Sequence, residues 1–216
     1  MKILIVGGTS ALAKTLLPVL SKFSDVLTAG RSECDIYIHL SEPIENIRIP
    51  EGTDVVVNVA ASFSGASFEQ IYDTENVNAL GVLKLCHACA EAQVKHLVLI
   101  SSIFVHLDKG SPQFSIYSLS KKHSDELAQL YSDNYKLPLT IWRPSQFYGV
   151  GAEQLRHQPF LSTIVSKIIN GEDVVLYGSN DAKRNFLHVE DLAHIISLVI
   201  RHKVLGTFDC PSPNDV

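Results

Sequence analysis

The sequence has no long apolar run, no block of basic residues and little cysteine, and each absence excludes a class of protein. No run approaches the roughly 20 apolar residues of a membrane-spanning helix, and the apolar start after Met1 and Lys2 is too short for a signal peptide. Lysine and arginine total 18 against 23 aspartate and glutamate, a formal net charge of −5, which disfavours binding to nucleic acid. We therefore expect neither a membrane nor a nucleic acid as a partner.

The four cysteines, Cys34, Cys86, Cys89 and Cys210, are too few for a disulfide framework. We expect reduced thiols in a cytoplasmic protein. Cys86 and Cys89 have the spacing of a metal-binding or redox pair, but they lie in a long segment of helical apolar periodicity with no second ligand pair at zinc spacing. Packing as small apolar side chains is the better interpretation, so the sequence predicts no metal site.

The rest of the composition is that of a globular protein. Hydrophobic residues make up 46% and charged residues 19% of the 216 positions, which argues against disorder. A chain of this length can bury a substantial core. We expect one compact body, with at most a smaller lobe beside the main domain.

The first structural pattern is a strand, a glycine turn and a helix. Lys2 to Val6 is a short apolar run, and GGTSALA follows it directly, ahead of leucines at helical spacing. Such a turn lets the backbone approach a pyrophosphate, which the helix N-terminus attracts through its free N–H groups. Ser10 and Ala13 stand where a dinucleotide fingerprint has its second and third glycines. Alanine is tolerated at the third place, and Ser10 is the weaker match.

An arginine follows the second predicted strand, Asp25 to Ala29. An acidic residue near this point bonds the ribose 2′-hydroxyl in sites that prefer NAD, whereas an arginine can hold the 2′-phosphate of NADP. Gly30 and Arg31 therefore favour NADP slightly. A solvated loop arginine explains the same residue equally well.

Strands and helices alternate along the chain, which implies an α/β fold with a doubly wound parallel sheet. The apolar patterns predict further strands at 34–40, 54–60, 96–100, 137–142 and 206–210, and long helices at 68–92 and 116–135. Such sheets bind ligands outside the carboxyl ends of their strands. The residues at predicted strand ends, which should converge on that edge, are Gly7, Arg31, Ala60, Ser102 and Arg143.

Tyr117 and Lys121 lie four residues apart at the start of the second long helix. One helical turn separates them, so the phenol and the ammonium project from the same face. A free tyrosine has a pKa of about 10, and a neighbouring positive charge favours the phenolate. The pair can therefore act as a proton shuttle, although the same spacing is common on solvated helix faces.

Six blocks in order carry a family resemblance: GGTSALA, DVVVNVAA, ISSIFV, YSLSK, RPSQFYG and RNFLHVEDLA. Together they resemble the extended short-chain dehydrogenase/reductases, the NAD-dependent epimerase/dehydratase family that acts on nucleotide sugars. The resemblance covers nearly the whole chain. It implies a Rossmann-like sheet that binds NAD or NADP, and a small C-terminal substrate lobe.

The resemblance implies roles for individual residues. Ser102, Tyr117 and Lys121 match the family's catalytic serine, tyrosine and lysine, and Gln146 and Arg184 match positions that contact the nucleotide-sugar substrate. Asn78 looks like a helix asparagine whose role is mainly structural. His39 and Leu40 match the family motif that flanks the adenine of the cofactor. Asp35 and Ile36 are an alternative match to the same motif. The implied cofactor-binding residues are Gly7, Ser10, Leu12, Arg31, His39, Leu40, Ala60, Ala61, Tyr117, Lys121 and Pro144.

The implied chemistry is hydride transfer at a sugar carbon, with Tyr117 moving the proton of the sugar hydroxyl. Dehydratases of the family carry an acidic pair directly after the catalytic serine or threonine, and this chain has Ile103 and Phe104 there. Dehydration is therefore disfavoured, and 4-epimerisation and reduction of a keto-sugar stay open. Arg31 tilts the choice slightly toward a reductase.

Two departures from the family pattern affect the expected organisation. Ser102 and Tyr117 are closer in sequence than is usual in the family, and the chain stops soon after the last predicted strand, so we expect a truncated lobe. We assign 1–143 and 186–210 to the nucleotide-binding domain, 144–185 to the substrate lobe and 211–216 to a truncated tail.

A non-catalytic NAD(P)-binding sensor or partner-binding module is the alternative function. The resemblance also implies a possible homodimer through the two long helices.

Overall fold

The computed structural model describes residues 1–63, 65–149, 159–175 and 183–215. Its centre is a seven-stranded sheet of order β3-β2-β1-β4-β5-β6-β9, in which every neighbouring pair is parallel. The predicted doubly wound α/β fold is confirmed. The strands are β1 (Lys2–Val6), β2 (Asp25–Gly30), β3 (Ile36–Tyr37), β4 (Val55–Asn58), β5 (His96–Ile100), β6 (Leu139–Pro144) and β9 (Gly206–Cys210).

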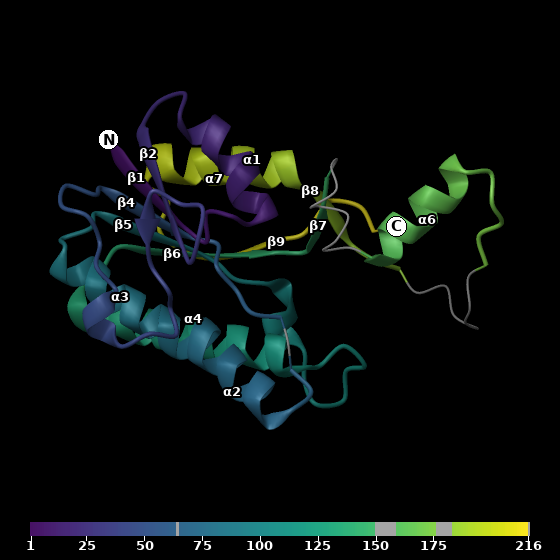
Figure 1. The fold of residues 1–216 in the computed structure, drawn as a ribbon, viewed down its shortest axis with the longest axis horizontal. Coiled ribbons are helices and arrows are strands. Elements are labelled where there is room, and N and C mark those ends of the chain that lie inside the picture. The colour runs from purple at the N-terminus through teal and green to yellow at the C-terminus, as the bar shows by residue number, and fades with distance from the viewer. Residues whose placement is uncertain (64, 150–158, 176–182, 216) are drawn as a thin grey trace.

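Helices cover both faces of this sheet (Figure 1). On one face lie α1 (Ala11–Leu20) and α7 (Val189–His202), and on the other lie α2 (Phe68–Glu75), α3 (Gly81–Glu91) and α4 (Ile116–Tyr135). Each face has its own apolar core, because alternate residues of a strand point to opposite faces. Leu4 and Val56 belong to the core under α3 and α4, whereas Ile3 and Val57 belong to the core under α1 and α7.

The first predicted long helix contains an irregular turn. Its helical span is close to the predicted 68–92, but a π-helical turn, Asn76–Leu80, separates α2 from α3. The π-turn carries Asn78, whose side chain is buried and bonds to groups outside its own helix. Such turns occur frequently at functional sites. Apolar periodicity does not reveal the turn, because one extra residue barely changes the pattern.

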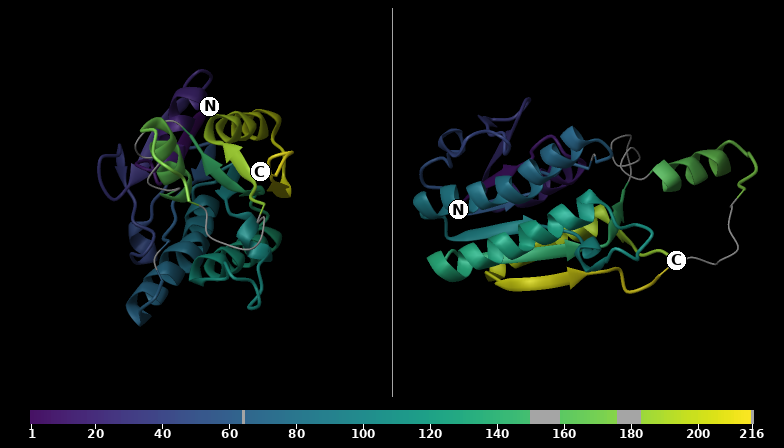
Figure 2. Two further views of the ribbon diagram at one scale, coloured as in Figure 1. Left: turned by 90° about the vertical axis from the view of Figure 1, so that its right-hand side faces the viewer. Right: turned by 90° about the horizontal axis from the view of Figure 1, so that it is seen from below.

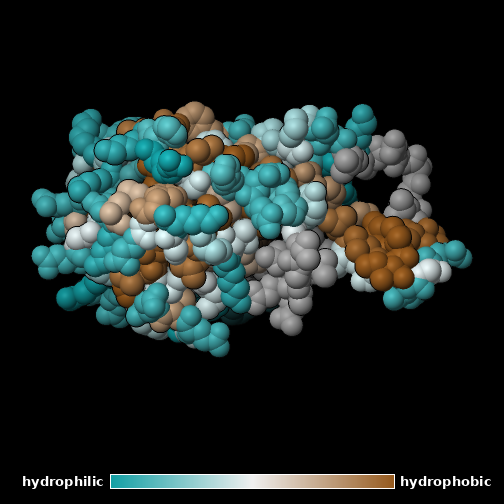
Figure 3. Space-filling model, turned by 90° about the horizontal axis from the view of Figure 1, so that it is seen from above, coloured by the Kyte–Doolittle hydropathy of each residue, from teal (hydrophilic) through white to brown (hydrophobic). Residues whose placement is uncertain are grey.

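A second, two-stranded parallel sheet pairs β7 (Gln146–Tyr148) with β8 (Phe186–His188) at the carboxyl edge of the main sheet. Beyond it, α6 (Pro159–Ile169) projects away from the three-layer body of sheet and helices (Figure 2). The apolar side chains of α6 form a patch at one end of the molecule (Figure 3), with Phe160, Val165, Ile168 and Ile169 exposed. The last described residues return to this region, where Asn185 bonds Ser212.

The described residues include neither a membrane-spanning helix nor a cluster of metal ligands. No helix among them is long and apolar enough to cross a membrane. Within the same ranges, no three histidine, cysteine or acidic side chains are grouped as metal ligands would be. All four cysteines are free thiols, and Cys86 and Cys89 are buried in the core under α3.

Candidate active site

The glycine turn after β1 is held against the end of β4. Gly7 has a φ of +93°, and a Cβ there would lie 2.7 Å from the backbone nitrogen of Ala60. Only glycine fits this position, because an added side chain would meet backbone that cannot move away. The turn therefore leaves the N-terminus of α1 close to the carboxyl ends of β1 and β4, where the order of the main sheet reverses.

The sequence-based roles of Ser10 and Leu12 are refined by the structure. Ser10 is the N-cap of α1, and its Oγ accepts a hydrogen bond from the Ala13 amide at 3.2 Å. The Leu12 side chain is 3% exposed and packs into the core under α1 and α7, so only its backbone is left to contact a pyrophosphate. The amides of Ala11 and Leu12 remain as the donors that this helix end directs outward.

The part of the site that is expected to hold the adenosine of the cofactor lies at the carboxyl ends of β2 and β3. Arg31 is exposed directly after β2. The His39 ring lies 3.1 Å from the Ser41 hydroxyl, whereas Leu40 is 3% exposed and packs against α3 at Gly81. Leu40 therefore offers backbone rather than side chain to a ligand. In the alternative alignment, Asp35 accepts hydrogen bonds from both the amide and the hydroxyl of Thr28.

Ser102, Tyr117 and Lys121 converge at the carboxyl end of β5. Ser102 is 8% exposed and follows the last residues of the strand, and its Oγ accepts from the Phe104 amide at 3.2 Å. Lys121 is 4% exposed, and its Nζ donates to the carbonyl oxygen of Ile100 at 2.8 Å. Tyr117, one turn before Lys121 in α4, interacts with the Ser102 side chain. The predicted trio is thus together in space.

The electrostatics of the pair differ from the sequence-based expectation. Burial raises the pKa of Tyr117 to about 12, partly offset by the Ser102 hydroxyl and increased by the charge of Asp125. Burial also lowers the pKa of Lys121 to about 8, and Asp125 acts in the opposite direction. The net shift of the Tyr117 pKa is therefore upward, because burial is its largest cause, whereas the charge of a neighbouring lysine alone favours a downward shift. The Lys121 ammonium donates its hydrogen bond to the Ile100 carbonyl.

Two neighbours of the trio were not predicted. The ring of Phe63, from the loop after β4, stacks on Tyr117 with centroids 4.8 Å apart. Loop residues have no periodic signal, so the sequence could not indicate this contact. Asp125 lies one turn after Lys121, 4% exposed, and accepts from Arg143 Nε at 2.8 Å. The four-residue spacing from Lys121 could have revealed it.

Asn78 ties the loop after β4 to α4, as its expected structural role requires. Its side chain accepts from the Ser62 amide at 2.8 Å and donates to the Ser62 carbonyl and the Ser120 hydroxyl, each at 2.9 Å. Ser120 immediately precedes Lys121 in α4. The half-buried Ala60 and Ala61 begin the loop that Asn78 anchors.

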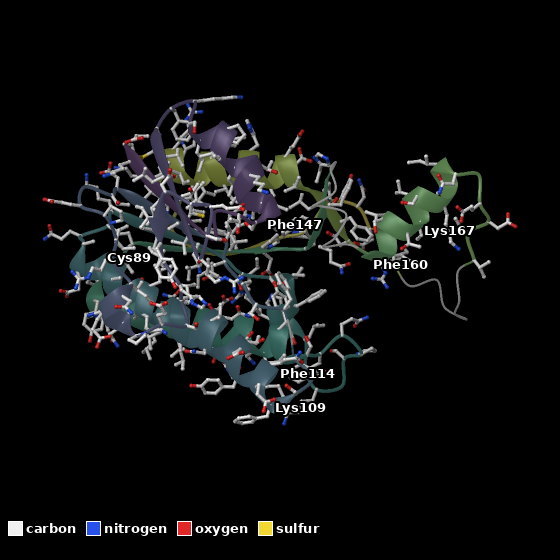
Figure 4. The ribbon with its side chains drawn as sticks, viewed as in Figure 1. Cys89, Lys109, Phe114, Phe147, Phe160 and Lys167 are labelled. Atoms are coloured by element: carbon white, nitrogen blue, oxygen red, sulfur yellow. The ribbon has the colours of Figure 1, made fainter. Side chains whose placement is uncertain are left out.

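The predicted substrate residues lie on two separate elements. Gln146 is half-buried at the start of β7, just after Pro144, which is buried at the end of β6. Arg184 is exposed, and its guanidinium lies over the Phe160 ring, 4.7 Å from the centroid. Phe160 is at the end of α6 that faces the main body, and Phe147 of β7 lies between that body and α6 (Figure 4). Arg184 is thus directed to α6 rather than to Tyr117.

The residues present fit a dinucleotide with one departure. A Cβ would clash at Gly7, the α1 N-terminus has outward amides, and Lys121 and Tyr117 lie on the same sheet edge. These are the features that bind a pyrophosphate and a nicotinamide ribose in such sheets. The departure is Ser10, whose hydroxyl satisfies one of the amides that a glycine would leave available.

Comparison with known proteins decides the family. The model of the NAD dependent epimerase/dehydratase family matches residues 3–208. The chain belongs to this family. Solved structures with the same fold include that of UDP-N-acetylglucosamine 4-epimerase from Methanobrevibacter ruminantium. That structure matches with a TM-score of 0.82 and 20% identity over 100% of this chain and 77% of the other. The UDP-glucuronic acid 4-epimerase of Bacillus cereus, solved with NAD, matches with a TM-score of 0.79 and 18% identity over 100% and 80%.

Curated relatives of this family member include two kinds of enzyme. The dTDP-D-glucose 4,6-dehydratase of Dictyostelium discoideum is 27% identical over 77% of this chain, and a probable UDP-glucuronate 4-epimerase of Rhizobium meliloti is 27% identical over 66%. The chain spans 42% and 44% of the lengths of these two relatives. The preference for NADP that Arg31 suggested has no support in these comparisons, which name NAD.

Proposed function

We propose that this protein catalyses NAD-dependent hydride transfer on a nucleotide-linked sugar, with 4-epimerisation as its reaction. The observation that carries the proposal is the convergence of Ser102, Tyr117 and Lys121 on the sheet edge that also holds the Gly7 turn. The bound nicotinamide would accept a hydride from a sugar carbon and return it to the opposite face. The curated 4-epimerase relative supports this choice of reaction.

The protein side chains would handle the proton. Tyr117 would take the proton from the sugar hydroxyl as the carbonyl forms, and would return it to the oxygen after the hydride comes back. Ser102 would donate a hydrogen bond to the developing carbonyl oxygen, and the Lys121 ammonium would stabilise the phenolate and bind the nicotinamide ribose. Proton transfer of this kind contributes roughly 10²- to 10⁴-fold, so positioning must supply the remainder of the rate enhancement.

The residues after Ser102 support epimerisation over dehydration. Elimination of water from a sugar needs an additional acid and base, and the two positions that follow Ser102 are Ile103 and Phe104. Both are half-buried in the short helical turn that Ser102 caps. Neither side chain can carry a proton. A dehydratase relative shares 27% identity with the chain, so this local difference is the basis on which we separate the two reactions.

The proposal is tested by turnover of the 216-residue protein with a panel of UDP- and dTDP-linked sugars and either NAD or NADP. We expect interconversion of 4-epimers, and its loss by at least about 10²-fold in Tyr117→Phe. Formation of a 4-keto-6-deoxy sugar would overturn the choice of reaction. Consumption of one equivalent of NADPH per keto-sugar would identify a reductase. Dinucleotide binding without any turnover would favour the non-catalytic sensor or partner-binding module.

A homodimer through the long helices is part of the proposal. Its support is that apolar side chains are exposed on both helices, including Ile71 and Tyr72 on α2 and Leu130 on α4, because an exposed apolar surface can mark an association site. Sedimentation velocity should then show a dimer that Leu130→Glu converts to a monomer. A wild-type protein that sediments as a monomer over the micromolar range would reject this part of the proposal.

A further inference from the structure

We propose that Asp125 is a positioning residue of this site, whose buried carboxylate is the counter-ion that keeps the Lys121 ammonium charged beside Tyr117. The inference rests on the proposed function for its consequence in catalysis. It rests on the structure alone for the charge state of Lys121. No role for Asp125 follows from the serine, tyrosine and lysine of the trio, since none of these three bonds its carboxylate directly.

The three residues form one row along α4. Tyr117, Lys121 and Asp125 are four residues apart, so they project from the same face of the helix, toward the ends of β5 and β6. Lys121 and Asp125 are each 4% exposed. An ammonium in such surroundings loses most of its hydration, and its hydrogen bond among the described residues goes to the neutral carbonyl of Ile100, 2.8 Å from Nζ. A nearby negative charge is therefore needed to stabilise it.

Only one of the two carboxylate oxygens of Asp125 has a hydrogen-bond partner among the described residues. Oδ2 accepts from Arg143 Nε at 2.8 Å. Oδ1 is buried, and within the described part of the chain it has no hydrogen bond. The Ser101 hydroxyl is near enough to favour the ionised carboxylate without reaching hydrogen-bond geometry. Oδ1 is therefore available to stabilise a second cation, and Lys121 lies one turn away on the same face of α4.

The charged groups around Asp125 come from several elements. On α4 they are Tyr117 and Lys121, and on β6 the only one is Arg143, whose Nη1 also lies 3.7 Å from Asp209 of β9. Asp209 in turn lies 3.0 Å from the His106 ring, in the turn after Ser102. Arg143 is therefore shared between two carboxylates. Asp209 is 45% exposed, so solvent screens it, and Asp125 is the buried anion of this group.

Removing the charge has a predictable direction. Burial already lowers the pKa of Lys121 to about 8, and Asp125 is the group that acts against this shift. With a neutral side chain at 125, Lys121 would lose its proton nearer neutral pH. The pKa of Tyr117 would fall as well, because Asp125 contributes to its increase. The carboxylate thus raises the pKa of both members of the proton shuttle, in addition to the larger effect of burial.

The test is competitive labelling of amines with limiting acetic anhydride across pH, read by mass spectrometry of the peptide that holds Lys121 and Lys122. Fragment ions separate the two lysines, and the exposed Lys122 is the internal reference. In Asp125→Asn we expect the labelling midpoint of Lys121 to fall by about one pH unit or more, with that of Lys122 unchanged. An unchanged midpoint of Lys121 would overturn the proposal.

Three further variants separate charge from packing. Asp125→Glu keeps the charge and should keep the midpoint close to that of the wild type. Ser101→Ala removes a neutral neighbour, so a shift as large as that of Asp125→Asn would show that hydration, not charge, sets the pKa. Arg143→Gln releases Asp125 from its competing cation and should raise the midpoint of Lys121. If Asp125→Asn does not fold, a midpoint that fails to rise in Arg143→Gln still overturns the proposal.

Labelling requires neither substrate nor turnover, so it distinguishes the two proposals. If the wild type turns over a nucleotide sugar, the alkaline limb of its pH–rate profile should shift downward in Asp125→Asn together with the Lys121 midpoint. A wild type without turnover would reject the proposed function, and the labelling result would still decide the role of Asp125. If Asp125→Asn changes the rate but leaves both the labelling midpoint of Lys121 and the alkaline limb of the pH–rate profile unchanged, Asp125 has a merely structural role and the proposal is overturned.

Discussion

The ring of Phe63 lies against the ring of Tyr117, with centroids 4.8 Å apart and an interplanar angle of 22°. Phe63 is itself 63% exposed, so its ring covers the phenol from the solvent side. The loop that carries it is packed on the start of α4, because a Cβ at Gly65 would lie 1.8 Å from the side chain of Ile116. Phe63 therefore contributes to the burial that raises the pKa of Tyr117.

Phe63→Ala should lower the pKa of Tyr117 from about 12 toward the ordinary value of about 10, since solvent then reaches the phenolate. The pKa can be followed by phenolate absorbance, with a Tyr117→Phe partner in each background to isolate this tyrosine. The matched control is Phe68→Ala, which removes an exposed phenylalanine that stacks on Tyr72 instead. An identical Tyr117 titration in wild type and Phe63→Ala would contradict the argument.

Gly7→Ala should be far more destabilising than Gly52→Ala, although both glycines have positive φ. Gly52 has a φ of +73° and nothing within 4 Å of an added Cβ, so alanine there should cost about 1–2 kcal/mol of left-handed strain. At Gly7 the same strain is joined by the contact with Ala60 backbone, which should add about 1–3 kcal/mol. Urea unfolding of both variants measures the difference. Equal losses would show that the turn is not held against β4.

His96 should make the fold sensitive to acid. It is 3% exposed, and its Nε2 lies 2.7 Å from Thr140 Oγ1, which donates its own proton to the Val204 carbonyl. The neutral ring therefore donates from Nε2. Burial lowers the pKa of His96 from 6.5 to about 4, so as pH falls the unfolded chain binds a proton before the folded one does. The free energy of unfolding should therefore decrease by ~3 kcal/mol as the pH falls from about 6.5 to about 4.

The variant that checks this is His96→Gln, whose amide nitrogen can replace Nε2 as donor without titrating. Its free energy of unfolding should vary less between pH 6.5 and 4.5 than that of the wild type, measured by urea denaturation at each pH. His202→Gln, at an exposed position at the end of α7, should keep the wild-type slope. If the slopes of all three proteins coincide, His96 is not the group responsible.

Arg31→Ala tests the choice of cofactor. If the exposed guanidinium after β2 holds a 2′-phosphate, its removal should weaken NADP binding by about tenfold or more, because a charge-assisted hydrogen bond contributes ~1.5–3 kcal/mol. NAD binding should change little. Calorimetric titration with both dinucleotides measures the ratio of affinities before and after the substitution. A ratio that stays the same would identify Arg31 as a solvated loop residue and leave NAD as the cofactor.

Local sequence patterns were sufficient to predict the strands and the helix that carry the site residues. The bounds of β1, β5, β9 and α4 follow from apolar periodicity, and the shared face of Tyr117 and Lys121 follows from one helical turn. The convergence of strand ends at one edge follows from parallel topology. These features depend on neighbours a few residues apart or on rules of chain connection, so the sequence by itself determined them.

Contacts across long sequence distances were decided only by the tertiary structure. Phe63 meets Tyr117 and Asp125 meets Arg143 across different elements, and Leu12 and Leu40 turn inward where the family pattern suggested a ligand. The protonation of Tyr117 depends on such contacts, because burial is the largest cause of the rise in its pKa. Spacing determined which groups could form the proton shuttle, and desolvation, which depends on the packing of the whole fold, determined their charge.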